Sequence, residues 1–235
     1  MTGELVFDDV DAGYGPYRAL LGLRLAITAT ERVALLGHNG AGKSTVARVA
    51  SGLVPVTSGQ LTLFGRHFFR YPSDRTRAGL WHLPEGVGLF GTLSLDENIE
   101  LRASHLPRTR RRAMVATAYE LIGSLAVKRH QRARELSGGQ QRLVAAACAV
   151  AATPRLLIAD EPTIGLSPAA AADVYRALAS LPRETTLLII ETSLDRVESL
   201  CDRAVVMNRG RVLVDGDWEQ ARRALRTPFH PESPS

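Results

Sequence analysis

The chain has 235 residues, of which 45% are hydrophobic, and a formal net charge of +5. Such a length and apolar content suit one large α/β domain with a substantial core. No apolar run approaches the ~20 residues that a membrane span needs, and the first four residues lack a basic, apolar signal pattern. Composition therefore argues against an integral membrane protein, and we expect a cytoplasmic chain that reaches a membrane only through a partner.

Both cysteines are isolated in the sequence. We expect Cys148 to lie in an apolar helix and Cys201 in a helix that ends near Asp202. Their separation indicates neither a disulfide framework nor the ligand spacing of a metal site.

The first third of the chain combines short strands with a glycine-rich loop. Strands are expected at residues 5–10, around residues 25–27 and at residues 60–64. An apolar strand at residues 33–36 precedes the loop, and a helix continues over residues 46–51. Residues 37–45 match the pattern G-x-x-x-x-G-K-[ST] in this strand, loop and helix context, which disfavours the alternative of a chance match.

That loop has the chemistry of a phosphate-binding site. Its glycines let backbone N–H groups point inward at phosphates, Lys43 meets the β and γ charges, and the Ser44 hydroxyl reaches Mg²⁺. The expected nucleotide-binding residues are Gly37, His38, Asn39, Gly40, Ala41, Gly42, Lys43, Ser44 and Thr45.

Residues from about 90 to 152 are predicted to be helical. Ser94 and Glu97 form a capping box at the start of one helix. A second helix, running to about Ile122, opens on Arg108, Arg110, Arg111 and Arg112. Arginines oppose the helix dipole there, so this cluster either faces anionic headgroups or an acidic partner, or is a solvated helix face.

Residues 136–142, with the sequence LSGGQQR, place a second capping box at the start of an alanine-rich helix. Ser137 is followed three residues later by Gln140, and Gly138 and Gly139 add no side-chain bulk. Unpaired N–H groups, a hydroxyl and the positive end of the helix dipole can close on a phosphate. By itself this pattern is equally compatible with an ordinary capped helix.

The apolar strand at residues 156–159 ends in two carboxylates, Asp160 and Glu161. In parallel sheets, ligands bind at the carboxyl ends of strands. Asp160 is therefore expected to serve Mg²⁺, and Glu161 the terminal phosphate and its attacking water. Two carboxylates after a strand can also form a solvated turn.

Strands are expected again at residues 187–190, 204–207 and 212–214, the last two joined by a turn at residues 208–210. Helical residues are thus inserted into one α/β core. The tail at residues 227–235 contains three prolines and is predicted to be disordered.

Together, the loop at 37–45, the segment at 136–142 and the strand at 156–161 resemble the ATPase subunit of ABC transporters, over nearly the whole chain. The resemblance implies a P-loop NTPase core, an α/β fold with an antiparallel β subdomain and an inserted helical subdomain. It implies one domain over residues 1–226, with the core at about 1–84 and 153–226 and the helical subdomain at about 90–152. Tyr14 matches the aromatic residue that stacks on adenine, although a tyrosine packing locally in a turn is the alternative.

In this family two subunits enclose two ATP molecules, each using its own phosphate loop and the partner's segment 136–142, hereafter the signature segment. Ser137, Gly138, Gly139 and Gln140 would therefore contact the partner's ATP. The implied partners are a second ATPase subunit and transmembrane permease subunits at the cytoplasmic face of the membrane. Nucleic-acid binding is not expected, because no aromatic residues interleave with the basic ones.

Three positions depart from the family pattern. The usual histidine that touches the γ-phosphate is replaced by Thr192, and the sequence has no histidine between His130 and His230. Threonine cannot be cationic and lacks the reach of an imidazole, which predicts slow hydrolysis at this chain's own site.

A glutamine that usually reaches Mg²⁺ is replaced by Glu85, which either still binds the metal or faces water. An aspartate is replaced by Ser167, which before Pro168 also fits simple helix initiation. These departures resemble the ATPases of branched-chain amino-acid importers, which often form heterodimers. The predicted function is an ATPase of an importer for amino acids or similar solutes; a slow regulatory ATP-binding subunit and a soluble ABC ATPase outside transport are the alternatives.

Overall fold

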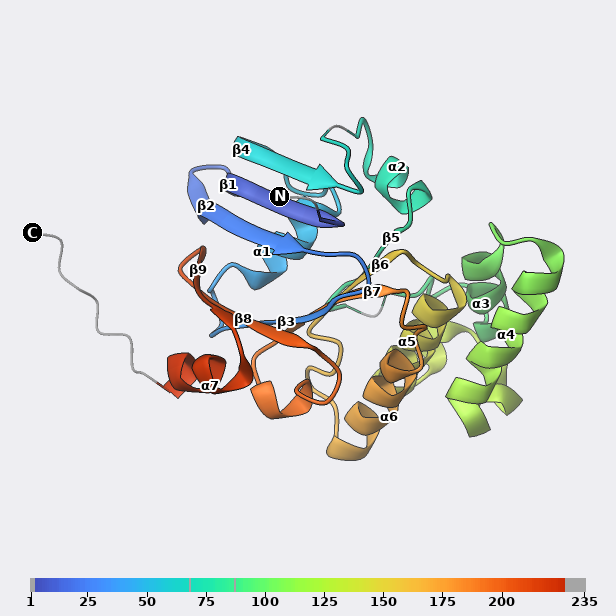
Figure 1. Cartoon of the computed structure of the whole chain (residues 1–235). Helices are drawn as coiled ribbons and strands as arrows, with labels where there is room; N and C mark the ends of the chain where they lie inside the picture. The colour runs from blue at the N-terminus through green and yellow to red at the C-terminus, as the bar shows by residue number, and fades with distance from the viewer. Residues whose placement is uncertain (1–2, 68, 87, 227–235) are drawn as a thin grey trace, which may run out of the picture. The chain divides into compact units, whose positions relative to one another are not determined.

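The computed structural model describes residues 3–67, 69–86 and 88–226 (Figure 1). Its contacts divide the chain into two compact units. The first comprises Met1–Phe69 and Ile189–Ser235, and the second comprises Arg70–Leu188. The tail predicted to be disordered, residues 227–235, lies outside the described residues.

The first unit contains an antiparallel sheet of three strands in the order β2-β1-β4. Its strands are β1 (Leu5–Tyr14), β2 (Tyr17–Ile27) and β4 (Val56–Leu63). The three expected strands are confirmed, and each is longer than predicted. β1 and β2 continue into a hairpin in which Tyr14 pairs with Tyr17, which places two aromatic residues at one turn.

A second set of strands in the first unit carries the phosphate loop. β3 (Arg32–Leu36) pairs in parallel with β8 (Arg203–Asn208), and β8 pairs antiparallel with β9 (Arg211–Gly216). Every residue of β3 is buried, as the apolar run at residues 33–36 predicts for a parallel strand, and the charged Arg32 at its start is buried with them. The predicted turn between β8 and β9 is confirmed: Arg209 and Gly210 both have positive φ, at 45° and 77°, as a two-residue hairpin of type I′ requires.

Two α-helices and one short 3-10 segment complete the described part of this unit. They are α1 (Lys43–Ala50), α7 (Trp218–Arg226) and the segment Leu194–Arg196. The sequence did not predict α7. Cys201 lies outside any helix, so its predicted helical position was wrong. The chain between Leu194 and Arg203 instead forms turns that lead into β8.

The second unit contains β5 (Leu80–Leu83) and β6 (Leu156–Asp160), which pair in parallel. β7 (Thr186–Glu191) follows in the order β5-β6-β7 and continues into the first unit. The second unit also contains the helices α2 (Pro72–Arg77) and α6 (Pro168–Ala179). The strand β6 is confirmed, whereas β5 and α2 were not predicted, because each has six residues or fewer and shows no clear period.

Residues 95–151 of the second unit are mainly helical, which confirms the prediction for about 90 to 152. α3 (Leu95–Ala103), α4 (Arg108–Ile122) and α5 (Gly138–Ala151) pack around one apolar cluster, with 3-10 segments at Gly123–Lys128 and Ala133–Glu135. The cluster includes Ile99, Ile122 and Val144. Cys148 also lies in it, on α5 as expected. Among the described residues, no helix has the length and apolar character that crossing a bilayer demands.

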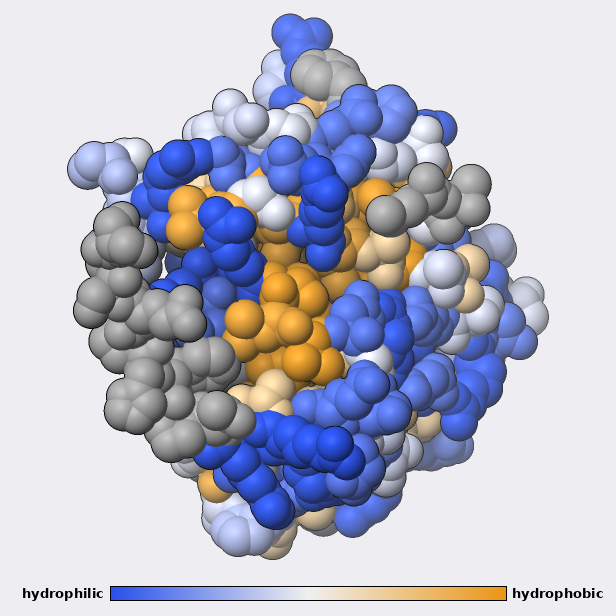
Figure 2. Space-filling model, turned by 60° about the vertical axis from the view of Figure 1, so that its left-hand side comes forward, coloured by the Kyte–Doolittle hydropathy of each residue, from blue (hydrophilic) through white to orange (hydrophobic). Residues whose placement is uncertain are grey.

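The surface carries some exposed apolar residues. Figure 2 shows hydrophobic side chains gathered at the centre of one face and surrounded by largely hydrophilic ones. Large apolar side chains with exposed surface include Tyr17, Leu53 and Leu213 in the first unit and Phe90, Leu101 and Val127 in the second. Apolar patches bordered by polar residues are typical of surfaces that contact other molecules.

Candidate nucleotide site

The phosphate loop runs from the end of β3 into α1 and wraps around a buried lysine. Lys43 is only 4% exposed, and its Nζ donates hydrogen bonds to the carbonyl oxygens of Gly37 at 2.8 Å and His38 at 3.2 Å. The loop carbonyls thus fix the position of the ammonium group. A cation held at the base of a loop is suited to neutralising a polyphosphate.

Two glycines make this loop geometry possible. Gly42 has φ of +98°, and a Cβ there would lie 2.7 Å from the carbonyl oxygen of Ala19. A Cβ on Gly37 would lie 2.4 Å from the carbonyl oxygen of Met207. Side chains at these positions would collide with neighbouring backbone, so the close turn requires glycine.

The helix that follows begins without a side-chain cap. Gly42 occupies the N-cap position of α1 and makes no side-chain cap hydrogen bond. A helix N-terminus with no side chain across it is a typical position for a bound anion. Together with Lys43, this arrangement fits the phosphates of a nucleotide.

Tyr14 lies at the hairpin end of β1 and is 41% exposed. Its hydroxyl accepts a hydrogen bond of 2.9 Å from Nη1 of Arg48, whose guanidinium carbon lies 5.9 Å from the ring centroid. Tyr17, across the same hairpin, is 61% exposed. The ring of Tyr14 is therefore held beside α1, and stacking on adenine stays a prediction for which Tyr17 is a second aromatic candidate.

Thr192 lies in the first unit, directly after β7. It is exposed, and its backbone N–H donates to the carboxylate of Glu191 at 3.3 Å. Thr192 shares an open cavity of about 460 Å³ with His38 and Asn39 of the phosphate loop. The position that usually carries a histidine thus faces the loop, and a histidine of the loop lines the same cavity.

The acidic pair lies in the second unit. Asp160 is the last residue of β6 and is 2% exposed, while Glu161 follows it with a positive φ of 44°. Such a φ is uncommon for a residue other than glycine and often marks functional positions. The carbonyl oxygen of Glu161 lies 3.4 Å from Nη1 of Arg142, the last residue of the signature segment, which orients the turn.

The charge of Glu85 also affects the pKa of Arg142. Burial lowers the pKa of the Arg142 guanidinium, and the negative charge of Glu85 opposes that shift. Glu85 itself is exposed. The structure therefore connects Glu85 electrostatically with the signature helix, a relation that the sequence did not reveal.

The signature segment begins α5 with the predicted capping box. The Ser137 hydroxyl accepts a hydrogen bond from the backbone N–H of Gln140 at 3.4 Å, and the Gln140 side chain accepts one from the N–H of Ser137 at 3.2 Å. A Cβ on Gly139 would lie 3.3 Å from Cβ of Ala170 on α6, whereas one on Gly138 would meet nothing within 4 Å. Gly139 thus serves packing within the chain, and Gly138 leaves backbone open to an outside group.

The two other capping predictions are also confirmed. Ser94 and Glu97 form the box at the start of α3. Ser167 caps α6, with Pro168 as its first residue, and its hydroxyl accepts from the N–H of Ala170 at 3.4 Å. The replacement at Ser167 is therefore explained by helix initiation.

The residues present fit a magnesium ion carried with a nucleotide. Within the described ranges, no group of three or more His, Cys, Asp and Glu side chains could hold a metal ion by itself. Ser44 in the first unit and Asp160 in the second are each a hard oxygen donor of the kind that Mg²⁺ accepts. Mg²⁺ takes one or two such ligands from protein and the others from substrate phosphates and water.

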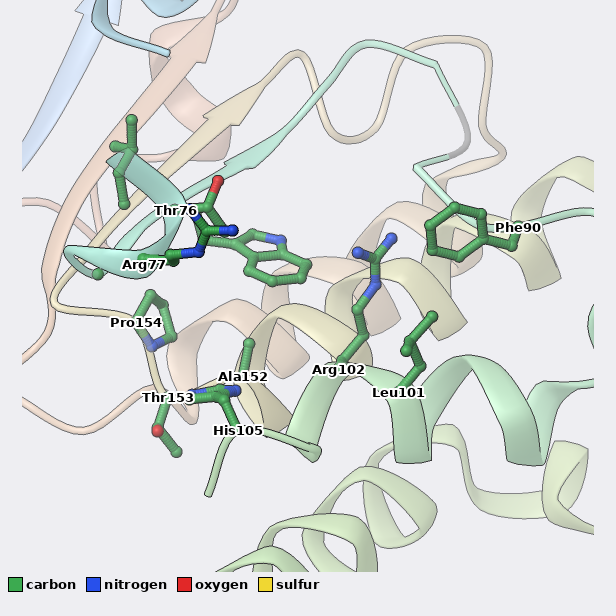
Figure 3. A pocket seen from close by; sticks show the side chains of 12 residues that line it. Thr76, Arg77, Phe90, Leu101, Arg102, His105, Ala152, Thr153 and Pro154 are labelled. Atoms are coloured by element: carbon green, nitrogen blue, oxygen red, sulfur yellow. The ribbon is translucent and has the colours of Figure 1, made fainter. Parts of the chain in front are cut away.

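A larger cavity of about 490 Å³ lies in the second unit (Figure 3). Its wall combines aromatic and aliphatic side chains with the cations Arg77 and Arg102. The Arg102 guanidinium lies 4.7 Å from the ring centroid of Trp81 and 4.8 Å from that of Phe90, so it sits between two aromatic rings. Burial lowers its pKa. This cavity has no signature in the sequence, because its residues come from segments that are far apart along the chain.

Comparisons with known proteins identify the family of the chain. Residues 20–164 match the family model described as ABC transporter. The high-affinity branched-chain amino acid transport ATP-binding protein BraG of Pseudomonas aeruginosa is 31% identical over 212 residues, covering 89% of this chain and 91% of that protein.

The lipopolysaccharide export system ATP-binding protein LptB of Haemophilus influenzae is 30% identical, covering 92% and 91%. A solved structure of an ATP-binding subunit of an ABC transporter superposes with a TM-score of 0.83 at 27% identity, covering 95% of each chain.

Proposed function

The chain belongs to the ABC transporter family as an ATP-hydrolysing subunit, and from this premise we propose that it energises an importer of amino acids or similar small solutes. The observation that supports the activity most is the buried Lys43 under an uncapped helix N-terminus. The importer assignment is supported by the similarity to BraG and by Glu85 and Ser167 at their family positions. The similarity to LptB, an export protein by name, leaves cargo and direction to experiment.

We assign the catalytic roles as follows. Lys43 and the first turn of α1 bind the β- and γ-phosphates, while Glu161 polarises the water that attacks the γ-phosphate. Ser44 and Asp160 would hold Mg²⁺, which neutralises charge on the phosphates when bound. Thr192 faces the phosphate loop with a short hydroxyl in place of an imidazole. We therefore expect slow ATP hydrolysis at this site.

A second chain completes each site. Because Gly138 and Ser137 are exposed at the start of α5, the signature segment is available to close over ATP held by another subunit. Closure would then be driven by ATP binding more tightly to the closed state than to the open one. We propose a heterodimer, since the departures at Thr192 and Glu85 leave this chain's own site less competent than its signature segment.

Transmembrane subunits are the other proposed partners, and they would hold the chain at the cytoplasmic face of the membrane. We assign their docking to the cavity around Arg102. Trp81 and Phe90 flank the segment that carries Glu85, so a permease segment seated there would act on the same stretch of chain. Aromatic rings and two arginines suit a segment that offers apolar and acidic side chains.

The proposal is tested by reconstitution in liposomes with the co-purified permease and ATPase partner. ATP-dependent uptake of an amino acid is the expected result, and Phe90→Ala should weaken co-purification with the permease. Val127→Ala is the matched control, because Val127 is a more exposed apolar residue outside the cavity. Recovery of the chain only in complexes without membrane subunits would overturn the transport function.

One alternative function has a specific observation in its favour. Thr192 at the loop-facing position suits a regulatory subunit that binds ATP chiefly to hold two subunits together. Tight ATP binding with negligible turnover in the presence of the cognate partner would support that function, whereas robust turnover would exclude it.

A further inference from the structure

The phosphate loop itself carries a histidine, at a position that faces the replaced one. His38 and Thr192 are 154 positions apart in sequence, yet with Asn39 they line one cavity of about 460 Å³ within the first unit. His38 and Thr192 are both exposed. We propose that His38 supplies the imidazole N–H to the terminal phosphate of ATP that Thr192 cannot supply.

Two hydrogen bonds within the phosphate loop hold the backbone of His38. Its carbonyl oxygen accepts hydrogen bonds from Nζ of Lys43 at 3.2 Å and from the N–H of Ala41 at 3.1 Å. The residue is therefore positioned by the same lysine that binds phosphate. His38 also lines the cavity that it shares with Thr192, beside the loop in which we propose that the phosphates bind.

The imidazole of His38 provides the N–H donor that Thr192 lacks. A histidine ring reaches farther than a threonine hydroxyl and always carries at least one N–H donor. During hydrolysis, negative charge builds on the phosphate oxygens, and a donor aimed there stabilises the transition state more than the ground state. His38 neither forms nor breaks a bond in this role; water attacks phosphorus, and the bond to the β-phosphate oxygen breaks.

This inference rests on the proposed function, because it concerns the same hydrolytic site. It predicts that the residual turnover of this site depends on His38, and that a histidine restored at position 192 takes over the task. A histidine at position 192 then compensates for the loss of His38, and this compensation can be measured.

The test compares the unmodified chain with His38→Ala, Thr192→His and the double variant, each assembled with its partner subunits. Single-turnover ATP hydrolysis at this chain's site and the affinity for a fluorescent ATP analogue are measured. We expect His38→Ala to lower the hydrolysis rate about tenfold or more, as the loss of a transition-state donor does, with affinity changed by less than about twofold. His38→Gln, which keeps an N–H donor, should lose less than His38→Ala.

In the Thr192→His background, the same His38→Ala change should lower the rate by less than about threefold, because position 192 then supplies the donor. The exposed His130 gives the matched control, since His130→Ala should change neither quantity. An unchanged rate in His38→Ala, equal losses in both backgrounds, or a loss of affinity equal to the loss of rate would each overturn the role of His38. Absence of turnover in the unmodified complex and in Thr192→His would instead overturn the proposed function.

Discussion

Two helix N-termini of this chain are predicted to bind phosphate, and they are built differently. α1 starts at Gly42 with no side-chain cap and with Lys43 fixed beneath the loop. α5 starts at Ser137, whose hydroxyl already caps the helix through the N–H of Gln140. The N-terminus of α1 is built for a nucleotide bound by this chain's own residues. The N-terminus of α5 is already capped by its own side chain, and Gly138 leaves its backbone open to an outside group.

The groups for binding ATP and the groups for hydrolysing it also differ in how closely they follow the family pattern. The phosphate loop has the buried Lys43 and the helix N-terminus that the proposed phosphate site uses, whereas Thr192 occupies the position at which the family resemblance implies a histidine. The signature segment has no departure from pattern. We therefore propose that the chain is better equipped to complete a partner's ATP site than to hydrolyse ATP in its own, and the following changes test that contrast.

Lys43→Ala should remove most of the nucleotide affinity of the isolated chain. The lost charge-assisted hydrogen bonds are worth about 1.5–3 kcal/mol, which corresponds to roughly a ten- to hundredfold weaker affinity. Titration with a fluorescent ATP analogue measures the change. Lys128, an exposed residue and the second of the chain's two lysines, provides the control, and equal affinities for the Lys43→Ala and Lys128→Ala chains would contradict the assignment.

Glu161→Gln should separate hydrolysis from binding at the chain's own site. The amide keeps the size of the side chain but cannot accept a proton from water, so single-turnover hydrolysis should fall by about 10²-fold or more. ATP affinity should stay within about twofold. If turnover survives at half its original rate, Glu161 does not polarise the water.

Gly138→Ala should affect only the partner's site. A Cβ there meets nothing within 4 Å, so the thermal unfolding midpoint should not fall. Hydrolysis at the partner's phosphate loop should drop by about tenfold, since a methyl group displaces backbone N–H groups from the phosphate. Unchanged hydrolysis at the partner's site would mean that the signature segment does not close over it.

Thr192→His should raise turnover at the chain's own site. The imidazole adds a donor near charge that develops in the transition state, and we expect a gain of about three- to tenfold in single-turnover hydrolysis. Circular dichroism confirms that the variant is folded. A folded variant with the original rate would show that the slow step lies elsewhere.

Ser167→Asp should have the smallest effect. Aspartate caps helices about as well as serine, so the free energy of unfolding should change by less than about 0.5 kcal/mol. Chemical denaturation measures this change. A destabilisation above about 1 kcal/mol would show that Ser167 does more than start α6.

The sequence predicted most of the fold where local rules are strong. The apolar strand before Gly37 and the capping boxes at Ser94 and Ser137 are all present, because period and capping chemistry act within a few residues. β5 was missed because its four residues, LWHL, carry no alternation and become a strand only beside β6. Cys201 was wrongly placed in a helix, since turns leading to β8 share the polar composition of a helix end.

Relations between distant residues escaped the sequence entirely. His38 was predicted as one of nine loop residues, with nothing to connect it to Thr192. The sequence places Arg142 only at the end of the signature segment. In the structure it contacts the carbonyl oxygen of Glu161, and the charge of Glu85 affects its pKa. Contacts of this kind depend on how strands and helices are brought together, which local patterns do not specify.

The contrast between the two helix N-termini is tested most directly in the complex of this chain with its ATPase partner, by removing hydrolysis from one site at a time. One complex carries Glu161→Gln in this chain, and the other carries the corresponding change in the partner. Steady-state ATP hydrolysis should fall by less than half in the first complex and almost completely in the second. A larger loss from Glu161→Gln in this chain than from the partner's change would contradict the account.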